Sequence, residues 1–254
     1  MKNKILFLSL FIMTGFFCGF SQNNPEWLDY LNKGEQANQN KNYSQAIKFY
    51  QQAIEKGDSL ISPYEMALLL VEGTPEFSPN ISKAISLMEI SAKHENPIAM
   101  TFLGDAYYFG MGVSQNLYQS FDWYRKAAEL DDPNGQYKLA LMYLDGEGVP
   151  QNTKKGLDWL QKAADNGSAA AMDSFAIIYG YGQFGLAEDL EKFVYWSRKG
   201  AENGDPQSQY RMGLIYLNGI GGVKSNKTEA IKWFQKSAEQ GYELSIIKLA
   251  EISN

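Results

Sequence analysis

The chain has 254 residues, of which 44% are hydrophobic, 20% charged and 14% aromatic, a composition typical of a folded protein and not of a disordered one. The formal net charge is −6, which argues against a basic face for phosphate contacts. We therefore expect no nucleic acid partner.

The first residues follow the sequence pattern of a secretory signal. A short basic segment with Lys2 and Lys4 precedes the apolar run 5–17, which is shorter than the roughly 20 residues of a membrane-spanning helix. The small residues Gly19 and Ser21 then suit a cleavage site. We expect an exported protein, periplasmic or secreted, with no membrane span.

Cleavage would divide the chain into a signal peptide, 1–21, and a single mature domain, 22–254. The only cysteine, Cys18, lies in the removed part, so the mature protein would contain no disulfide. The bulky Phe16 and Phe17 precede Cys18 where a lipobox needs small residues, which argues against a lipid anchor there.

The rest of the chain repeats with a period of 36–38 residues. One series holds an aromatic residue or leucine: Phe49, Leu87, Trp123, Trp159, Trp196 and Trp233. A second series, in step with the first, holds glycine or alanine: Ala67, Gly104, Ala140, Ala176, Gly213 and Ala250. Two series in step predict a stack of similar units, since one unit cannot bury its apolar face alone.

Each unit is predicted to contain two helices. From the apolar spacing, the first helices begin near residues 26, 60, 97, 134, 168, 206 and 242. The second helices begin near residues 43, 81, 117, 153, 190 and 227. Gly-x-Gly segments, clearest at 110–113 and 146–149, should end the first helices, because glycine tolerates the left-handed conformation at a helix C-terminus.

The domain 22–254 is thus expected to be an all-α solenoid of antiparallel helix pairs. It comprises a first unit at 22–58, further units at 59–241 and an unpaired last helix, 242–254, that caps the stack. The small series marks places where two helices approach closely, and the aromatic series, such as Trp123, is expected to fill the space between neighbouring units.

The order small-x-x-x-Leu-Gly/Ala-x-x-Tyr, Gly-x-Gly-Val, Trp-x-x-Lys-Ala-Ala resembles the Sel-one-like repeat, most clearly at 99–128, 135–164 and 208–238. The first unit looks more like a tetratricopeptide repeat, through Gly34, Tyr43, Ala46, Tyr50 and Ala53. The resemblance implies a right-handed α/α superhelix that serves as a protein-interaction scaffold. A cysteine-rich subgroup linked with penicillin-related activity is a poor guide for a mature chain without cysteine.

The sequence offers little chemistry for catalysis. His94 is the only histidine, and at the end of a helix such a residue is usually a surface or cap residue. The Gly-x-Gly segments recur in successive units and follow helices, so they do not indicate a phosphate loop. The acidic pairs 131–132 and 188–189 more simply cap helices. We expect no enzyme, no cofactor and no metal site.

By analogy with tetratricopeptide stacks, the first helices would line a concave groove. The residues that would face it are Thr101, Asp105, Tyr108, Tyr137, Leu141, Asp173, Ile177, Tyr181, Tyr210, Leu214 and Asn218. This mixture of aromatic, aliphatic and polar side chains suits an extended peptide or a helix. The alternative is that the same side chains pack inside the superhelix.

The expected function is therefore binding of a protein or peptide partner, whose identity the sequence leaves open together with the oligomeric state. Two other hypotheses are a hydrolase acting on cell-wall peptides or β-lactams, suggested only by the cysteine-rich subgroup, and a carbohydrate- or peptidoglycan-binding module whose groove aromatics stack on sugars.

Overall fold

The computed structural model describes residues 25–253, and within this range it consists of 13 α-helices and one isolated β-bridge between Thr74 and Phe77. The predicted all-α class is confirmed. The proposed signal peptide, 1–21, lies outside the described residues. The first helices of the units are α2 (Glu26–Gln39), α4 (Ile61–Glu72), α6 (Pro97–Phe109), α8 (Pro133–Asp145), α10 (Ala169–Tyr181), α12 (Pro206–Asn218) and α14 (Glu243–Ser253). The second helices are α3 (Tyr43–Glu55), α5 (Ile81–Lys93), α7 (Leu117–Glu129), α9 (Thr153–Asp165), α11 (Leu190–Glu202) and α13 (Lys227–Glu239).

The helices begin within one residue of the predicted positions, and short polar side chains cap α3 and each helix from α5 to α13. Before α9, the side chain of Asn152 accepts a hydrogen bond from the Lys155 amide at 3.0 Å. Before α8, Asp132 accepts from the Gly135 amide at 2.6 Å, and Pro133 occupies the first helical position, where no amide hydrogen is needed.

The first helices from α6 to α12 end at a glycine in the left-handed conformation, as predicted. Gly146, for example, has φ +76° and donates its amide to the carbonyl of Met142 at 2.9 Å. The second glycine of this loop, Gly148, packs on the start of α7. A Cβ added there would lie 2.3 Å from the carbonyl oxygen of Leu117, so the loop joins one unit to the unit before it.

Within a unit, the two helices approach through complementary side-chain volumes. A Cβ added at Gly104 would lie 2.4 Å from ring atoms of Tyr124, which is fully buried. Equivalent contacts join Gly34 to Tyr50 and Gly213 to Phe234. In the three remaining two-helix units, alanine holds the small position and the position equivalent to Tyr124 carries Met88, Leu160 or Ser197.

These contacts show which aromatic residue packs at the small position. The residue that fills the space at the small position is the one after the series, Tyr124 and not Trp123. Trp123 is half-buried, and the Lys126 ammonium lies 4.2 Å from its ring centroid. Trp159 does contact the apolar clusters of two neighbouring units, as was expected of the series.

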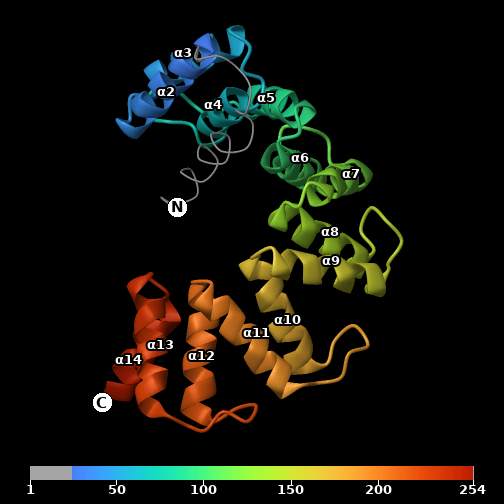
Figure 1. Cartoon of the computed structure of the whole chain (residues 1–254), viewed down its shortest axis with the longest axis vertical. Helices are drawn as coiled ribbons and strands as arrows, with labels where there is room; N and C mark the ends of the chain where they lie inside the picture. The colour runs from blue at the N-terminus through green and yellow to red at the C-terminus, as the bar shows by residue number, and fades with distance from the viewer. Residues whose placement is uncertain (1–24, 254) are drawn as a thin grey trace.

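Each helix packs mainly on the helices next to it in sequence, which produces the curved stack seen in Figure 1. Hydrogen bonds between polar side chains also connect neighbouring units. Gln136 bonds to Asn166 at 2.9 Å, and Gln209 bonds to Gln240 at 2.9 Å. None of the described helices is both long enough and apolar enough to cross a membrane.

The last described helix, α14, packs on α13. The hydroxyl of Ser245 donates to the hydroxyl of Ser237 at 2.7 Å, and both residues are fully buried. Leu244, Ile246 and Ile247 remain about half exposed on the opposite face, because no further helix follows among the described residues.

Candidate interaction surface

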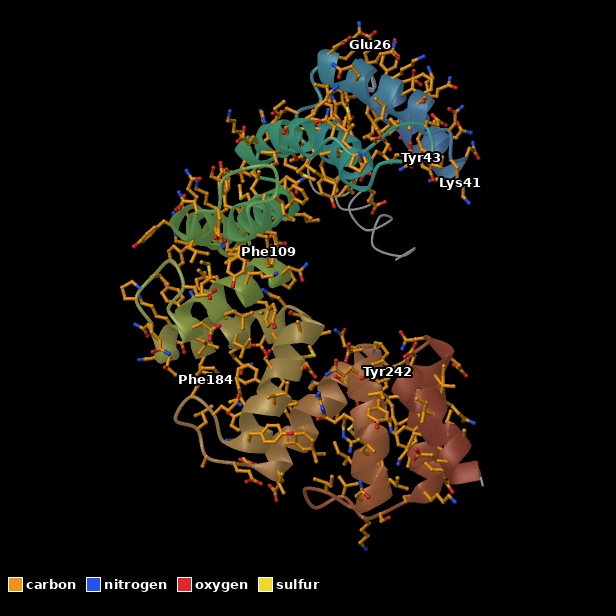
Figure 2. All side chains as sticks on the ribbon, turned by 180° about the vertical axis from the view of Figure 1, so that it is seen from behind. Glu26, Lys41, Tyr43, Phe109, Phe184 and Tyr242 are labelled. Carbon is orange, nitrogen blue, oxygen red and sulfur yellow. The ribbon has the colours of Figure 1, made fainter. Side chains whose placement is uncertain are left out.

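In the N-terminal half of the described stack, first helices lie on the inner side of the arc. Figure 1 shows α4 and α6 on the inner side of the arc, with α5 and α7 outside them, and α6 also contacts α8 directly. In the reverse view of Figure 2, Phe109 at the end of α6 faces the opening of the arc, whereas Phe184 lies on the outer rim.

The structure exposes the predicted groove residues to different degrees. Tyr181 is 77% exposed and Ile177 36%, and Asn218 is exposed too. Half-buried are Asp105, Tyr108, Tyr137, Leu141, Asp173, Tyr210 and Leu214. Thr101 is buried. The surface thus combines accessible side chains at the ends of the first helices with partly covered ones nearer their middle.

Two of the predicted residues use their polar groups for contacts between units. The Thr101 hydroxyl donates to the Asp132 carboxylate at 2.8 Å. The Tyr108 hydroxyl donates to Glu147 at 2.5 Å, and this hydrogen bond, together with burial, raises the pKa of Tyr108 to about 12. Both contacts join α6 or its end to the following unit.

Ion pairs also connect consecutive first helices along the concave side. The Lys138 ammonium lies 3.0 Å from the Asp105 carboxylate, which also accepts a hydrogen bond from the Tyr124 hydroxyl at 2.6 Å. Farther along, Arg211 lies 2.5 Å from Asp173, and both side chains are mostly buried. Removing one partner of such a covered pair leaves the other charge uncompensated.

The N-terminal end of the same side carries two carboxylates that the groove prediction missed. Glu35 directly follows the small residue Gly34, as Asp105 follows Gly104, and Glu65 precedes Ala67 by two positions, as Lys138 precedes Ala140. Both glutamates are half-buried. The repeat register contains the signal for them, because the position two before the small residue faces the neighbouring unit.

Burial raises the pKa of Glu65 to about 7, and the negative charge of Glu35 adds to this effect. Burial also raises the pKa of Glu35. Neither carboxylate forms a hydrogen bond or an ion pair with another residue of the range 25–253.

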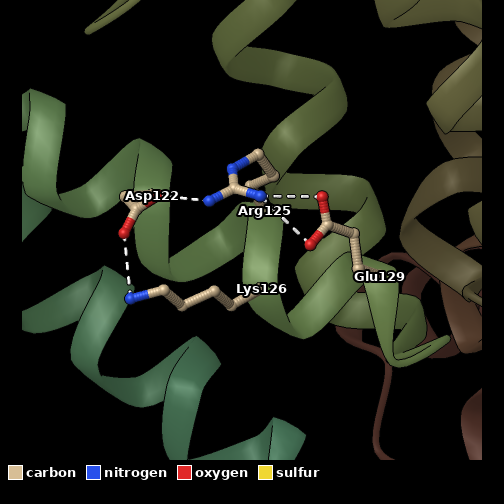
Figure 3. A network of polar contacts seen from close by, with 4 residues as sticks. All are labelled: Asp122, Arg125, Lys126 and Glu129. Carbon is tan, nitrogen blue, oxygen red and sulfur yellow. Dashed lines mark hydrogen bonds and ion pairs between the residues drawn. The ribbon is translucent and has the colours of Figure 1, made fainter.

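Other charged clusters have simpler explanations. Figure 3 shows Arg125 of α7 bound to Asp122 at 2.6 Å and to Glu129 at 2.8 Å, with Lys126 on the other side of Asp122. All four lie on one exposed face of a single helix, where such pairs contribute at most about 1 kcal/mol. They stabilise α7 and offer no chemistry.

The structure also agrees with the expectation for His94. It is an exposed residue at the C-terminus of α5, and its Nδ1 lies 3.0 Å from the Ile90 carbonyl oxygen. In the described part of the chain, no three histidine, cysteine or acidic residues gather as metal ligands would.

The sequence matches the family model described as Sel1 repeat in six consecutive copies, at residues 30–58, 64–96, 97–132, 133–168, 169–205 and 206–242. These matches include the first unit, in which tetratricopeptide features had been noted. No curated protein matches the chain.

Solved structures share the fold. A Sel1 repeat protein from Oxalobacter formigenes has a TM-score of 0.79 at 25% identity, over 91% of this chain and 66% of that one. A protective antigen present in uropathogenic Escherichia coli strains, displaying an SLR fold, has a TM-score of 0.66 at 28% identity, over 90% of this chain and 49% of that one. This chain therefore spans about two thirds of the first protein and half of the second.

An immunity protein from Pseudomonas aeruginosa has a TM-score of 0.57 at 14% identity, over 87% of this chain and 84% of that one, a likeness of fold alone. With the helix pairs described above, these similarities confirm the predicted right-handed α/α superhelix.

Proposed function

Because this chain belongs to the Sel1 repeat family, whose repeats are protein-interaction modules, we propose that it is an exported scaffold that binds a partner protein through its concave side. No catalytic step is part of this proposal.

The observation that carries the proposal is one row of equivalent positions, five residues after the small residue, where the first helices end. From α6 to α12 the row holds Phe109, Asp145, Tyr181 and Asn218, and all four are exposed. The buried small position varies only between glycine and alanine, whereas this exposed row changes from aromatic to acidic to amide. Packing does not require such variety, so recognition of a particular partner is the better explanation.

The two aromatic members of the row are the most suitable anchors for a partner. Phe109 is 61% exposed and Tyr181 77% exposed. Aromatic side chains contribute large contact areas and dominate many protein interfaces. Their separation by two units suits an extended peptide or a helix laid along the stack.

A photo-crosslinking residue at Tyr181 tests the proposal directly. Tyr118 on the second helix α7 is the matched control, because it is 78% exposed and lies outside the row. In extracts of the producing cells, the substituted position 181 should yield a discrete crosslinked protein that position 118 does not. Equal labelling at the two positions, or no product at position 181, would contradict binding through the concave side.

Export has its own test. The expressed full-length protein should appear in the periplasmic or extracellular fraction with Gln22 as its first residue, because cleavage after Ser21 removes the predicted signal peptide. N-terminal sequencing of the fractionated protein measures this. An intact Met1 in the cytoplasmic fraction would disprove export.

The exposed aromatics also favour a second candidate, a carbohydrate- or peptidoglycan-binding module, since Phe109 and Tyr181 could stack on sugar rings. Retention on insoluble peptidoglycan that is lost in Tyr181→Ala and kept in Tyr118→Ala would favour this candidate over a protein partner. Turnover of a β-lactam or of peptidoglycan by the purified protein would instead support the hydrolase.

A further inference from the structure

One contact between units contains a complete polar triad. At the junction of α6, α7 and α8, the ring of Tyr124 lies against Gly104 and its hydroxyl donates to Asp105 at 2.6 Å. The ammonium of Lys138, on the next first helix, lies 3.0 Å from the same carboxylate oxygen. Hydroxyl, carboxylate and cation thus satisfy one another.

The junction of α2, α3 and α4 repeats this arrangement without the cation. Tyr50 packs its ring on Gly34 through the same two edge atoms that Tyr124 uses, with distances of 2.5 Å to an added Cβ. Glu35 takes the place of Asp105. Glu65 takes the place of Lys138, so a second carboxylate stands where the chain elsewhere supplies an ammonium.

A third unit also has glycine at the small position, and it lacks both the tyrosine hydroxyl and the acidic residue. Gly213 also receives an aromatic ring, but it is Phe234, and the residue after the glycine is Leu214. Tyrosine therefore occurs in the two units with an acid at that position, and phenylalanine in the unit without one.

At the junction of α2, α3 and α4, the tyrosine hydroxyl and the two carboxylates therefore lack the partners that the other junction provides. The hydroxyl of Tyr50 is fully buried and makes no hydrogen bond within residues 25–253, although the side chain of Asn38 comes near it. Burial raises the pKa of this hydroxyl, and the negative charges of Glu65 and Glu35 raise it further. The two glutamates have no basic partner in the described residues and remain partly exposed.

We propose that Glu35, Glu65 and Tyr50 form a binding site for a basic side chain, a lysine ammonium, of the partner protein. The proposal rests on the proposed function, and it specifies the chemistry of one contact. Lys138 shows the geometry with which this scaffold receives an ammonium. Two carboxylates without a basic partner are the electrostatic complement of such a cation when they are ionised.

The chain itself provides the first test. Glu65→Lys should complete the triad and raise the midpoint of thermal unfolding above that of Glu65→Gln, which only removes the repulsion. The reverse change, Lys138→Glu, should lower the midpoint relative to Lys138→Gln, because it creates a second pair of unpaired carboxylates. A Glu65→Lys midpoint at or below that of Glu65→Gln would overturn the proposal.

The second test measures binding without any knowledge of the partner. The probe is the acetylated, amidated peptide Gly-Gly-Lys-Gly-Gly, and the same peptide with norleucine is the control. Titration of the full-length protein, followed by the amide NMR signals of Gly34 and Glu35, should show saturable shifts with the lysine peptide only. Glu65→Lys should bind at least about tenfold more weakly, a loss of about 1.4 kcal/mol.

The two proposals can fail separately. If crosslinking at Tyr181 succeeds while the lysine peptide produces no saturable shift, the concave side binds a partner but the acidic site is wrong. If the peptide binds and Glu65→Lys abolishes that binding while crosslinking yields nothing, the cation site stands and the interaction role of the exposed row is wrong.

Discussion

Gly104 and Tyr124 show how two helices of one unit divide the available volume. The small series predicted close approach from the sequence, and that prediction is confirmed by the contact of Gly104 with the ring. The identity of the large residue was not predicted, because Trp123 and Tyr124 are both aromatic neighbours and only the rotation of α7 decides which one faces α6.

Gly104→Ala should destabilise the protein by about 1–3 kcal/mol, because the added methyl group overlaps a fully buried ring. This opposes the usual gain of glycine-to-alanine changes in helices. Chemical denaturation measures the loss.

The double variant Gly104→Ala, Tyr124→Leu is the control, since it copies the Ala140 and Leu160 pair found two helices later. The leucine change should cost less in the alanine background than in the wild type. Strict additivity of the two changes would show that the contact does not limit packing.

Glu65 should make the stability of the folded protein depend on pH. Its folded-state pKa, about 7, lies above the ordinary value of 4.5, so between these values the folded protein binds more protons than the unfolded chain. The favourable contribution of protonated Glu65 is complete below the ordinary pKa and is lost as the pH rises through about 7. The other titratable groups beside it are Glu35, Tyr50 and Tyr64.

Wild-type protein should therefore lose about 1–3 kcal/mol of stability between about pH 5 and about pH 8 through Glu65. In Glu65→Gln this component should disappear, so the stabilities of the two proteins diverge as the pH rises, with the variant more stable at the alkaline end. Denaturation curves over the range measure the difference. Parallel pH profiles would contradict a raised pKa at this residue.

At the scale of the element, helix limits were predictable and side-chain environments were less so. Caps such as Asn152 and terminal glycines such as Gly146 act within a few residues of sequence, which is why the expected helix starts agree with the structure. The loop contacts between units are not local. The second glycine of a loop, Gly148, meets α7 of the preceding unit, a contact that sequence spacing could not reveal.

Gly148→Ala should cost about 2–4 kcal/mol, because alanine is strained at φ +68° and its methyl group would meet the Leu117 carbonyl. Gly167→Ala is the matched control. That residue has φ +88° but no atom near an added Cβ, so only the backbone strain of about 1–2 kcal/mol remains. Equal losses by urea denaturation would rule out the loop contact as a source of stability.

At the scale of the whole molecule, the last described helix, α14, packs on α13 as a first helix packs on the unit before it. This helix covers α13 on one face and leaves Leu244, Ile246 and Ile247 about half exposed on the other. Since stacked repeats are stabilised mainly by nearest neighbours, the terminal helix should protect the unit before it.

Deletion of residues 242–254 should lower the thermal midpoint, because it uncovers Ser237 and the adjoining surface of α13. The control is Ile246→Ser in the full chain, which changes an exposed side chain and should shift stability by no more than about 0.5 kcal/mol. Calorimetry compares the two variants. An unchanged midpoint after deletion would mean that α14 does not cap the stack.

The sequence by itself determined the all-α class, the helix pairs and their limits, because period, caps and terminal glycines are local features that recur in most units. Only the tertiary structure decided how equivalent positions differ: Thr101 is buried while Tyr181 is exposed, and Lys138 completes a triad that Glu65 leaves open. The physical reason is that exposure and pairing depend on the register and rotation of neighbouring helices. Those relations arise only when the units are stacked.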